Sequence, residues 1–317
     1  MEQQFMKAAV CEAYGKPETV IVKQVPKPAI RPGEILIKVM ASTVNSGDVR
    51  MRGLKVNGWM KLVMRLILGF SKPRKSILGV TFSGVVERVG AKVSRFKPGD
   101  KLFGLTGFRF GAHAEYLCLS ERATMIEMPA NAGFEAAAAL PFGAHTAIHF
   151  LQAAGIEKLN RPRVAIYGAT GSVGIAALQV AAHYGAIITA VCSSRAAPSL
   201  STFTIDNIVL YDKTEFTRSG QQYDIIFDAV GKLSKKECRS LLAPHGKFVT
   251  VGGMAVAREN KEQLDLVRQL FEAGNYQAVI DKAFSLDEIV AAHEYVDTGR
   301  KIGNVVLKIG QEEVSSL

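Results

Sequence analysis

A glycine-rich turn between an apolar strand and an apolar helix is the segment of this sequence best suited to chemistry. Residues Arg163–Tyr167 are predicted to form the strand and Ser172–Tyr184 the helix. The small residues between them would let backbone N–H groups approach a diphosphate and let the helix pack closely on its strand. The sequence therefore predicts a dinucleotide-binding turn made of Gly168, Ala169, Thr170, Gly171, Ser172, Val173 and Gly174.

The end of the next strand indicates which dinucleotide is bound. An NAD site places Asp or Glu about 20 residues after the turn, on the ribose 2′-hydroxyl. The strand over 187–192 is followed instead by Ser193, Ser194 and Arg195, with no acid. Serine can donate a hydrogen bond to a 2′-phosphate, and arginine can pair with it. We therefore expect NADP(H) as the cofactor; the alternative is that Arg195 is an ordinary solvated loop residue.

Histidines and cysteines form no pattern typical of a metal site. The four cysteines are far apart and contain no CxxC pair. His145 and His149 are four residues apart, but no acid joins them in an HExxH arrangement. We interpret these two, and His113, as surface histidines or as histidines with satisfied hydrogen bonds.

The elements that would position these residues change character along the chain. Residues 6–40 and 84–119 alternate in the manner of short strands, which predicts a β-rich, partly barrel-like unit. From about Pro129, helices and short apolar strands alternate, which predicts a parallel sheet covered on both faces. A helix over 135–140 is expected to break at Pro141 and resume over 144–154. After about residue 275 the chain should return to the first unit, with a helix over 286–296 and a strand over 304–309.

Composition and charge fit a soluble protein of about two domains, at roughly 150 residues each. The 317 residues are 48% hydrophobic and 21% charged, with a net charge of +10 that is scattered along the chain. Scattered charge favours solvated faces and makes nucleic-acid binding unlikely. The start of the chain lacks a secretory pattern, and the apolar stretch Trp59–Phe70 is too short to cross a bilayer. We expect a cytoplasmic protein without a membrane span, in which 59–70 is a lid or packing helix.

Several motifs in a fixed order resemble the zinc-free quinone-oxidoreductase (zeta-crystallin-like) branch of the medium-chain dehydrogenase/reductase superfamily. The resemblance covers nearly the whole chain, and its carriers are Ala41–Asp48 with Arg52-Gly53, Leu78–Gly90, Phe96–Gly104, Ala139–Ala147, Gly168–Gly174, Asp228–Gly231 and Gly299–Val306. It implies an α/β protein with a GroES-like β-rich catalytic domain, residues 1–130 and 275–317. The remaining residues, 131–274, would form a Rossmann NADP-binding domain with a doubly wound parallel sheet.

The resemblance also implies roles for individual residues. Asn45 and Asp48 would lie near the nicotinamide, where Asn45 positions substrate or nicotinamide through its amide; a turn-stabilising asparagine is the alternative. Besides the turn and the 193–195 segment, cofactor contacts are implied for Thr146, Tyr211, Ala229, Val230, Val251, Gly252, Gly253 and Asn304.

The zinc-dependent branch of the superfamily can be compared position by position. Its catalytic metal ligands correspond to Asn45, Val80 and Phe142, and neither valine nor phenylalanine can coordinate zinc. Residues 90–117 contain none of the four cysteines of a structural zinc lobe. Zinc-free relatives often carry an acid where Thr81 stands, so the floor of the site departs from the pattern.

Without a Lewis acid, the substrate should be intrinsically electrophilic. We expect hydride transfer from NADPH to quinones or α,β-unsaturated carbonyl compounds, by a protein that the resemblance makes a homodimer. The alternatives are a zinc-free alcohol or aldehyde-type reductase of the same superfamily, or a nucleotide-binding protein with an RNA-binding or structural role. NADPH oxidation assays separate the enzyme from an RNA binder, whose retention on RNA should fall steeply with salt.

Overall fold

The computed structural model describes residues 3–54, 65–66, 68–253 and 256–310. The chain divides into two compact units, one formed by Met1–Pro141 with Ile280–Leu317 and the other by Phe142–Val279. The boundaries expected from the sequence were 130/131 and 274/275. Most of the helix expected over Trp59–Phe70 lies outside the described residues.

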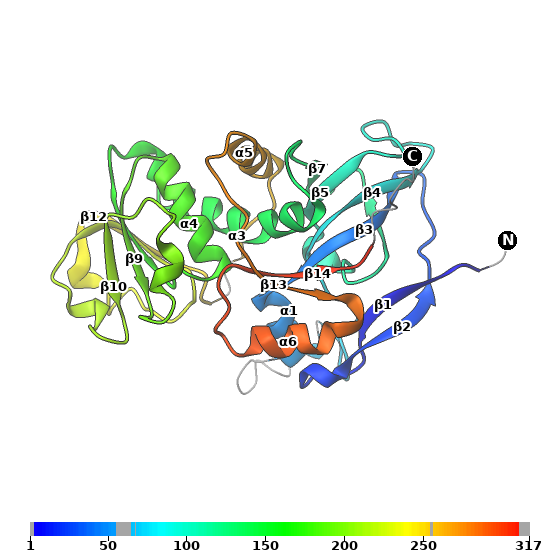
Figure 1. Cartoon of the computed structure of the whole chain (residues 1–317), viewed down its shortest axis with the longest axis horizontal. Coiled ribbons are helices and arrows are strands. Elements are labelled where there is room, and N and C mark those ends of the chain that lie inside the picture. Colours follow the sequence, from blue (N-terminus) through cyan, green and yellow to red (C-terminus); the bar gives the residue numbers. More distant parts are fainter. Residues whose placement is uncertain (1–2, 55–64, 67, 254–255, 311–317) are drawn as a thin grey trace. The chain divides into compact units, whose positions relative to one another are not determined.

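The first unit is built on a seven-stranded sheet in the order β13-β14-β3-β4-β5-β7, with β6 paired to β3. Its strands are β3 (Glu34–Val44), β4 (Thr81–Val89), β5 (Lys101–Leu105), β6 (Tyr116–Ser120), β7 (Met125–Glu127), β13 (Ile280–Ser285) and β14 (Asn304–Lys308). A separate hairpin consists of β1 (Phe5–Cys11) and β2 (Val20–Pro26). Because β14 pairs with β3, the end of the described chain closes the sheet begun near its start (Figure 1). The expected return of the chain is confirmed.

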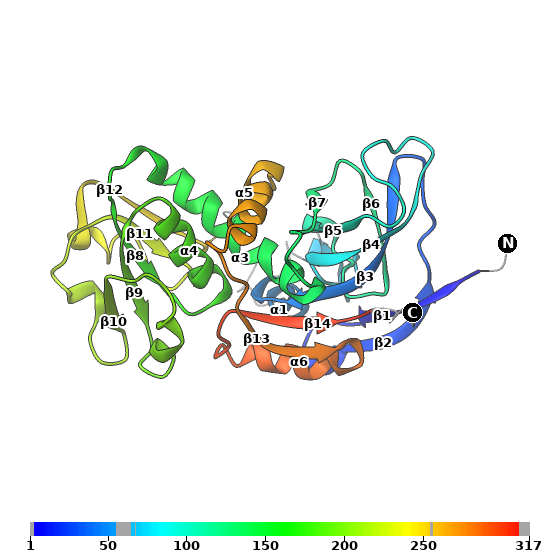
Figure 2. The ribbon, with the colours of Figure 1, turned by 45° about the horizontal axis from the view of Figure 1, so that its top comes forward.

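Several buried apolar clusters hold this unit together. Ile35, Ile37 and Val39 alternate along β3 and pack with Phe82 and Leu102 inside the curved sheet. A second core lies under the helix α6 (Ile289–Asp297), which runs beside β13 and β14 (Figure 2). The short helix α1 (Ser46–Gly53) follows β3 directly and contacts α6. The 3₁₀ turns of this unit are η1 (Pro17–Thr19), η2 (Gly107–Arg109) and η7 (Leu286–Glu288).

The second unit is a five-stranded parallel sheet in the order β10-β9-β8-β11-β12. Its strands are β8 (Arg163–Tyr167), β9 (Ile187–Cys192), β10 (Asn207–Leu210), β11 (Tyr223–Asp228) and β12 (Leu242–Thr250). Its helices are α4 (Ser172–His183) and α5 (Lys261–Glu272), with 3₁₀ turns η3 (Ile156–Lys158), η4 (Ala197–Leu200), η5 (Phe216–Arg218) and η6 (Arg239–Leu241). The strand order reverses between β8 and β11, which is the switch point where such sheets bind ligands.

The two faces of the parallel sheet are covered differently. Phe227 of β11 stacks on Phe150 of helix α3 (Phe134–Ala153), with ring centroids 5.7 Å apart. The neighbouring Ile226 faces the opposite way, toward Phe216 and Leu241 from the turns η5 and η6. The sheet is therefore covered on both faces as predicted, but short 3₁₀ turns replace helices on the second face.

The expected helix break at Pro141 is wrong, because α3 continues through it. Proline lacks an N–H, so the carbonyl of Ala137 loses its helical partner, and one lost hydrogen bond is normally enough to kink an exposed helix. Here Ala138, Leu140 and Ala144 are buried, so packing supports the helical turns on either side of the proline.

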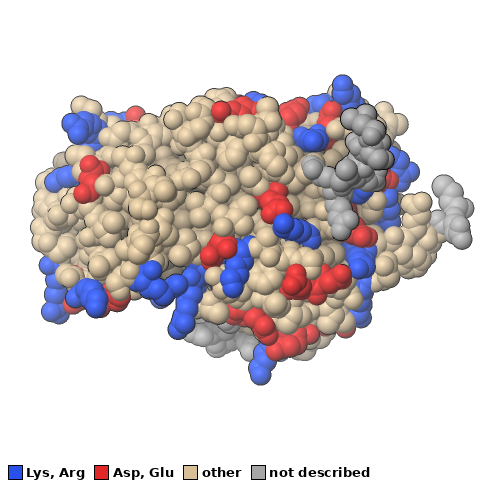
Figure 3. All heavy atoms as spheres, in the orientation of Figure 1, with Lys and Arg blue, Asp and Glu red and all other residues tan. Residues whose placement is uncertain are grey.

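Surface charge and helix hydropathy can be compared with what the sequence predicts. Basic and acidic side chains are interspersed over the face drawn in Figure 3. Among the helices that the structure describes, none is both long and apolar enough to cross a membrane.

Candidate cofactor and active site

The predicted cofactor residues follow the carboxyl ends of all five parallel strands. Gly168 comes after β8, Ser193 after β9, Tyr211 after β10, Ala229 after β11 and Val251 after β12. Carboxyl ends of parallel strands share one edge of the sheet, so the structure brings these residues to the edge that contains the switch point.

The glycines of the turn are required by close contacts. Gly168 has φ +78°, and a Cβ there would lie 2.0 Å from Cγ2 of Val230. A Cβ on Gly174 would lie 2.1 Å from the carbonyl oxygen of Gly168. A side chain at either position would push the loop after β11, or helix α4, away from strand β8.

Helix α4 begins with N–H groups that face outward unpaired. Gly171 is its N-cap residue and offers no side chain, and the first helical hydrogen bond runs from Ile175 N to Gly171 O at 2.8 Å. The N–H groups of Ser172, Val173 and Gly174 have no acceptor in the described parts of the chain. Unpaired N–H groups and the positive end of the helix dipole form a favourable place for an anion such as a diphosphate.

Asp228 organises the loops beside the switch point, a role that the sequence analysis did not assign. Its buried carboxylate accepts hydrogen bonds from N–H of Val230 (3.1 Å), Gly231 (2.9 Å) and Leu233 (2.8 Å), and from the Thr250 hydroxyl (3.0 Å). One carboxylate therefore ties the loop after β11 to the end of β12. The available signal was an acid that ends an apolar strand and is followed three residues later by glycine.

The same two loops touch through glycines. A Cβ on Gly231 would lie 2.9 Å from Cα of Gly252, and Val251 N donates to the carbonyl of Asp228 at 3.0 Å. Gly253 has φ +80°, and no atom lies within 4 Å of its ideal Cβ position. The predicted residues 251–253 thus form a tight backbone ledge next to 229–231.

The segment after β9 contains a feature that its own sequence does not reveal. Ser194 N donates to Asp212 Oδ1 at 2.8 Å, and the Ser194 hydroxyl donates to Asp212 Oδ2. These hydrogen bonds hold the pKa of Asp212 below its usual value. Arg195, the next residue in the sequence, is exposed. The interpretation of this site as free of acid is therefore incomplete, because a carboxylate arrives from the end of β10.

Tyr211 and Thr146 are the other predicted contacts of the second unit. Tyr211 is 44% exposed, and its ring centroid lies 5.7 Å from that of Tyr167. The Thr146 hydroxyl donates to the carbonyl of Phe142 at 2.7 Å, which leaves its oxygen lone pairs available as acceptors.

In the first unit, Asn45 and Asp48 form a capping box at the start of α1. Asn45 Oδ1 accepts from N–H of Gly47 (2.8 Å) and Asp48 (3.3 Å), and Asp48 Oδ2 accepts from Asn45 N at 3.0 Å. Asp48 Oδ1 accepts from Gly79 N at 3.0 Å. Asp48 is fully buried; burial raises its pKa, while His113 and the backbone donors act in the opposite direction. Both of its carboxylate oxygens are therefore occupied by backbone N–H groups, one of which is that of Asn45.

The amide of Asn45 retains an unused donor. Its Oδ1 is committed to the helix cap, which orients the carboxamide, and Nδ2 is buried without a hydrogen-bond partner among the described residues. Leaving such a donor unsatisfied costs about 1–3 kcal/mol. Asn45 is therefore both a turn-stabilising residue and an oriented donor. Asn304, the other predicted residue of this unit, is half-buried at the start of β14.

His113 contacts the backbone that leads into the Asn45 turn. Its Nε2 lies 3.0 Å from the Thr43 carbonyl, which can only accept, so Nε2 carries the proton. A Cβ on Gly79 would lie 2.5 Å from Cδ2 of His113, so only glycine fits under the ring. The ring of His293 lies edge-on at 6.2 Å, and burial lowers the pKa of His293 to about 3. His113 is thus a buried histidine held by the backbone.

His145 is also a buried histidine with a satisfied hydrogen bond. Its Nε2 accepts from Asn260 N at 3.1 Å, and burial lowers its pKa to about 4. Asn260 in turn caps helix α5 by accepting from Glu262 N at 2.7 Å. The imidazole therefore fastens the start of α5.

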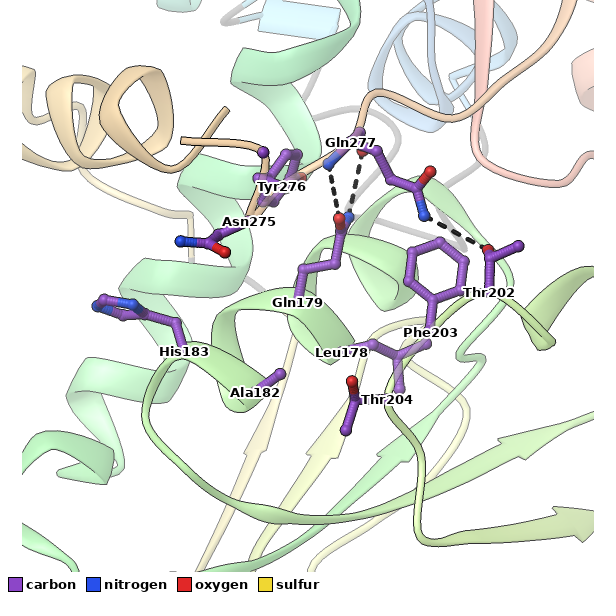
Figure 4. Close-up of a pocket in the computed structure, with 11 residues that line it drawn as sticks. Leu178, Gln179, Ala182, His183, Thr202, Phe203, Thr204, Asn275, Tyr276 and Gln277 are labelled. Atoms are coloured by element: carbon purple, nitrogen blue, oxygen red, sulfur yellow. Dashed lines mark hydrogen bonds between the residues drawn. The ribbon is translucent and has the colours of Figure 1, made fainter. Parts of the chain in front are cut away.

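A cavity of about 620 Å³ in the second unit lies at the far end of α4 from the glycine turn. Figure 4 shows how its polar groups are used. Gln179 accepts from Gln277 N (2.7 Å) and donates to Gln277 O (3.3 Å), and the Gln277 amide donates to the Thr202 hydroxyl at 3.4 Å. These amides brace the wall of the cavity, whose lining contains none of the residues of the glycine turn.

A Rossmann-like parallel sheet and a GroES-like β-rich unit in one chain define an NAD(P)H-dependent oxidoreductase. The alcohol dehydrogenase GroES-like domain family matches residues 31–130, and the zinc-binding dehydrogenase family matches residues 203–264 and 253–307. The chain belongs to the medium-chain dehydrogenase/reductase superfamily, in its quinone-oxidoreductase branch.

Relatives cover nearly the whole chain. It is 30% identical to the 2-methylene-furan-3-one reductase of Solanum lycopersicum, over 95% of this chain and 79% of that protein. It is 27% identical to the mitochondrial NAD(P)H oxidoreductase RTN4IP1 of Danio rerio, over 97% and 92% of the two chains. The quinone oxidoreductase structure from Coxiella burnetii superposes with a TM-score of 0.83 at 26% identity, covering 97% of this chain and 100% of that one.

Within the aligned region this chain is shorter than the Danio rerio protein. That alignment spans 359 positions, whereas this chain has 317 residues. The zinc-binding dehydrogenase family matches in two pieces that overlap at residues 253–264.

The described residues offer no cluster suited to the zinc named in that family description. Among the described residues, no three His, Cys, Asp or Glu side chains stand close enough to share a metal ion. Two of the three positions that correspond to catalytic ligands are Val80 and Phe142, which offer no donor atom.

Proposed function

We propose that this oxidoreductase uses NADPH, needs no zinc, and reduces quinones or α,β-unsaturated carbonyl compounds. The observation that carries the proposal is the buried, oriented Nδ2 donor of Asn45, located at a position that corresponds to a zinc ligand in metal-dependent relatives. One neutral donor stabilises developing charge on an oxygen less than a metal ion does, so the substrate must be activated by its own conjugation. The relatives named for enone and quinone reduction support this substrate class.

The chain supplies orientation and charge stabilisation. The nicotinamide supplies the hydride when bound. The N–H groups of Ser172–Gly174 would hold the diphosphate, with Ser193 and Arg195 at the 2′-phosphate and Tyr211 beside the adenosine. Thr146, the 251–253 ledge and Asn304 would contact the nicotinamide half. Asn45 would donate to the oxygen of the substrate or of the nicotinamide amide. The first unit is proposed as the catalytic domain and the second as the cofactor domain.

A co-substrate screen tests the proposal. NADPH depletion should be measured with an ortho-quinone, a 2-alkenal and the matching saturated aldehyde, and NADPH formation should be measured with a primary alcohol and NADP⁺. We expect turnover with the quinone and the 2-alkenal and none with the saturated aldehyde or the alcohol. The rates should be unchanged after dialysis against a chelator. Activity with only the aldehyde or alcohol would favour the aldehyde-type reductase, and recovery only on adding zinc would contradict a metal-free site.

The cytoplasmic location and the homodimeric state also belong to the proposal. Sedimentation velocity of the purified chain should give the mass of a dimer of 34.3 kDa subunits. A monomer over the micromolar range would contradict the dimer without affecting the proposed chemistry.

A further inference from the structure

A carboxylate from the end of β10 contacts the turn after β9, next to the two residues assigned to the 2′-phosphate. Strands β9 and β10 pair in parallel with Cys192 opposite Leu210. Continued two residues further, this register brings Ser194 beside Asp212, whose two carboxylate oxygens accept from the Ser194 N–H and hydroxyl.

The charges around Asp212 explain why it stays ionised. It is exposed to solvent, it receives two hydrogen bonds from Ser194, and the positive charge of Lys213 acts in the same direction. A dianionic phosphate held by Ser193 and Arg195 would share this short turn with a negative carboxylate. Two negative charges within one short turn repel each other, and solvent reduces this repulsion without removing it.

A carboxylate at this edge can also do what an acid does in NAD sites. There, an acid from the end of the second strand accepts a hydrogen bond from the ribose 2′-hydroxyl. Asp212 reaches the same turn from the end of the third strand, β10, and is already held there by Ser194.

We propose that Asp212 is a specificity-determining residue that weakens the preference for the 2′-phosphate and allows NADH to be used as well as NADPH. The inference rests on the proposed function, since it concerns the same cofactor site. Arg195 and Asp212 then oppose each other across Ser194, and the ratio of the two cofactors depends on both.

The test is direct binding of nucleotide fragments, which needs no substrate. Adenosine 2′,5′-bisphosphate and adenosine 5′-phosphate should be titrated by calorimetry into the wild type, Asp212→Asn and Asp206→Asn. The amide introduced by Asp212→Asn keeps an acceptor for Ser194 N. Asp206 is the matched control, because it accepts from Ile188 N at 2.7 Å between the same two strands, at the opposite edge of the sheet.

Asp212→Asn should tighten the bisphosphate about fivefold relative to the monophosphate, which is near the upper end of what one exposed pair of charges contributes. The gain should shrink as salt is raised, since screening extends over about 10 Å at 0.1 M. Asp206→Asn should leave the ratio within about twofold, as expected for a remote charge. The ratio of kcat/KM for NADPH over NADH should move in the same direction.

Two results would overturn the inference. Equal changes in the affinity ratio for Asp212→Asn and Asp206→Asn would mean that only the net charge matters. Weaker binding of both fragments by Asp212→Asn would mean that Asp212 only stabilises the conformation of the turn. In either case NADPH turnover by the wild type would leave the proposed function intact. A wild type that binds neither fragment would overturn both.

Discussion

Asn45 has two roles, helix capping and hydrogen-bond donation, that substitutions can separate. Its Oδ1 caps helix α1, whereas its Nδ2 is a buried donor with no partner in the described part of the chain. Asn45→Ser keeps a good N-cap and removes the amide donor, so kcat should fall about 10²-fold, as for loss of one oxyanion-type donor, with little change in stability.

Asn45→Ala provides the comparison. It loses the cap as well, so it should show the same fall in kcat and a further loss of about 1 kcal/mol in unfolding free energy. Steady-state kinetics and urea unfolding measure the two effects. Full activity in Asn45→Ser would remove Asn45 from the reaction and leave it as a capping residue.

Arg195 is the residue on which the choice of NADPH mainly depends. Arg195→Ala should raise the KM for NADPH about tenfold, the value of one hydrogen bond to a charged group, and leave the KM for NADH nearly unchanged. The measurement is initial rates with both cofactors at a fixed concentration of the quinone. An equal loss with both cofactors would refute the assignment of Arg195 to the 2′-phosphate.

At the scale of the element, the turn from β8 into α4 predicts opposite outcomes for two glycines. A Cβ on Gly174 would meet the Gly168 carbonyl at 2.1 Å, whereas a Cβ on Gly171 has no neighbour nearer than 3.7 Å. Gly174→Ala should therefore destabilise the protein by about 1–3 kcal/mol through overpacking. Gly171→Ala should lose less than about 1 kcal/mol and instead weaken nucleotide binding, because its methyl group stands where the diphosphate approaches.

Urea unfolding and NADPH fluorescence titration distinguish these two effects. If Gly171→Ala bound NADPH as tightly as the wild type, the diphosphate would not lie against this turn. If Gly174→Ala had the same free energy of unfolding as the wild type, helix α4 could shift away from the Gly168 carbonyl at no cost. The tight packing at Gly174 would then not contribute to stability.

The elements that sequence patterns predicted well are those with strong local signals. Strands β8 and β9 begin and end where expected, because each is a short apolar run bounded by turn residues. The strands β7 and β13 were not predicted, since β7 has only three residues and β13 carries Asp281 and Lys282. Their pairing depends on neighbours that are distant in the sequence, as does the continuation of α3 through Pro141.

The same distinction applies to the site. The glycine turn and Ser193 are local patterns and could be predicted from the sequence. The approach of Asp212 to Ser194 depends on the register of β9 against β10, and the hydrogen bond between His113 and the Thr43 carbonyl joins residues 70 positions apart. No local pattern contains either relationship, so both had to come from the fold.

At the scale of the whole molecule, buried neutral histidines should make stability depend on pH. Burial lowers the pKa of His145 to about 4 from its ordinary value of 6.5. Below pH 6.5 the unfolded chain takes up a proton that the folded chain refuses, so unfolding becomes easier as pH falls toward 4, by at most about 1.4 kcal/mol per pH unit for one such group. His293, with a pKa of about 3, acts in the same direction.

Urea unfolding at pH 7.5, 5.5 and 4.5 measures this slope. His145→Gln retains an acceptor for Asn260 N but cannot titrate, so its stability should fall less steeply over that range than that of the wild type. Parallel curves for the two proteins would mean that His145 is protonated equally in the folded and unfolded chains.

The link between β12 and α5 has a practical consequence for protein engineering. Helix α5 starts from its own cap and is held there by the His145 imidazole from α3. The same imidazole also interacts with the backbone of Arg258. A loop spliced in from a relative should therefore leave Arg258 and Asn260 in place, so that the contacts that fix the start of α5 are kept.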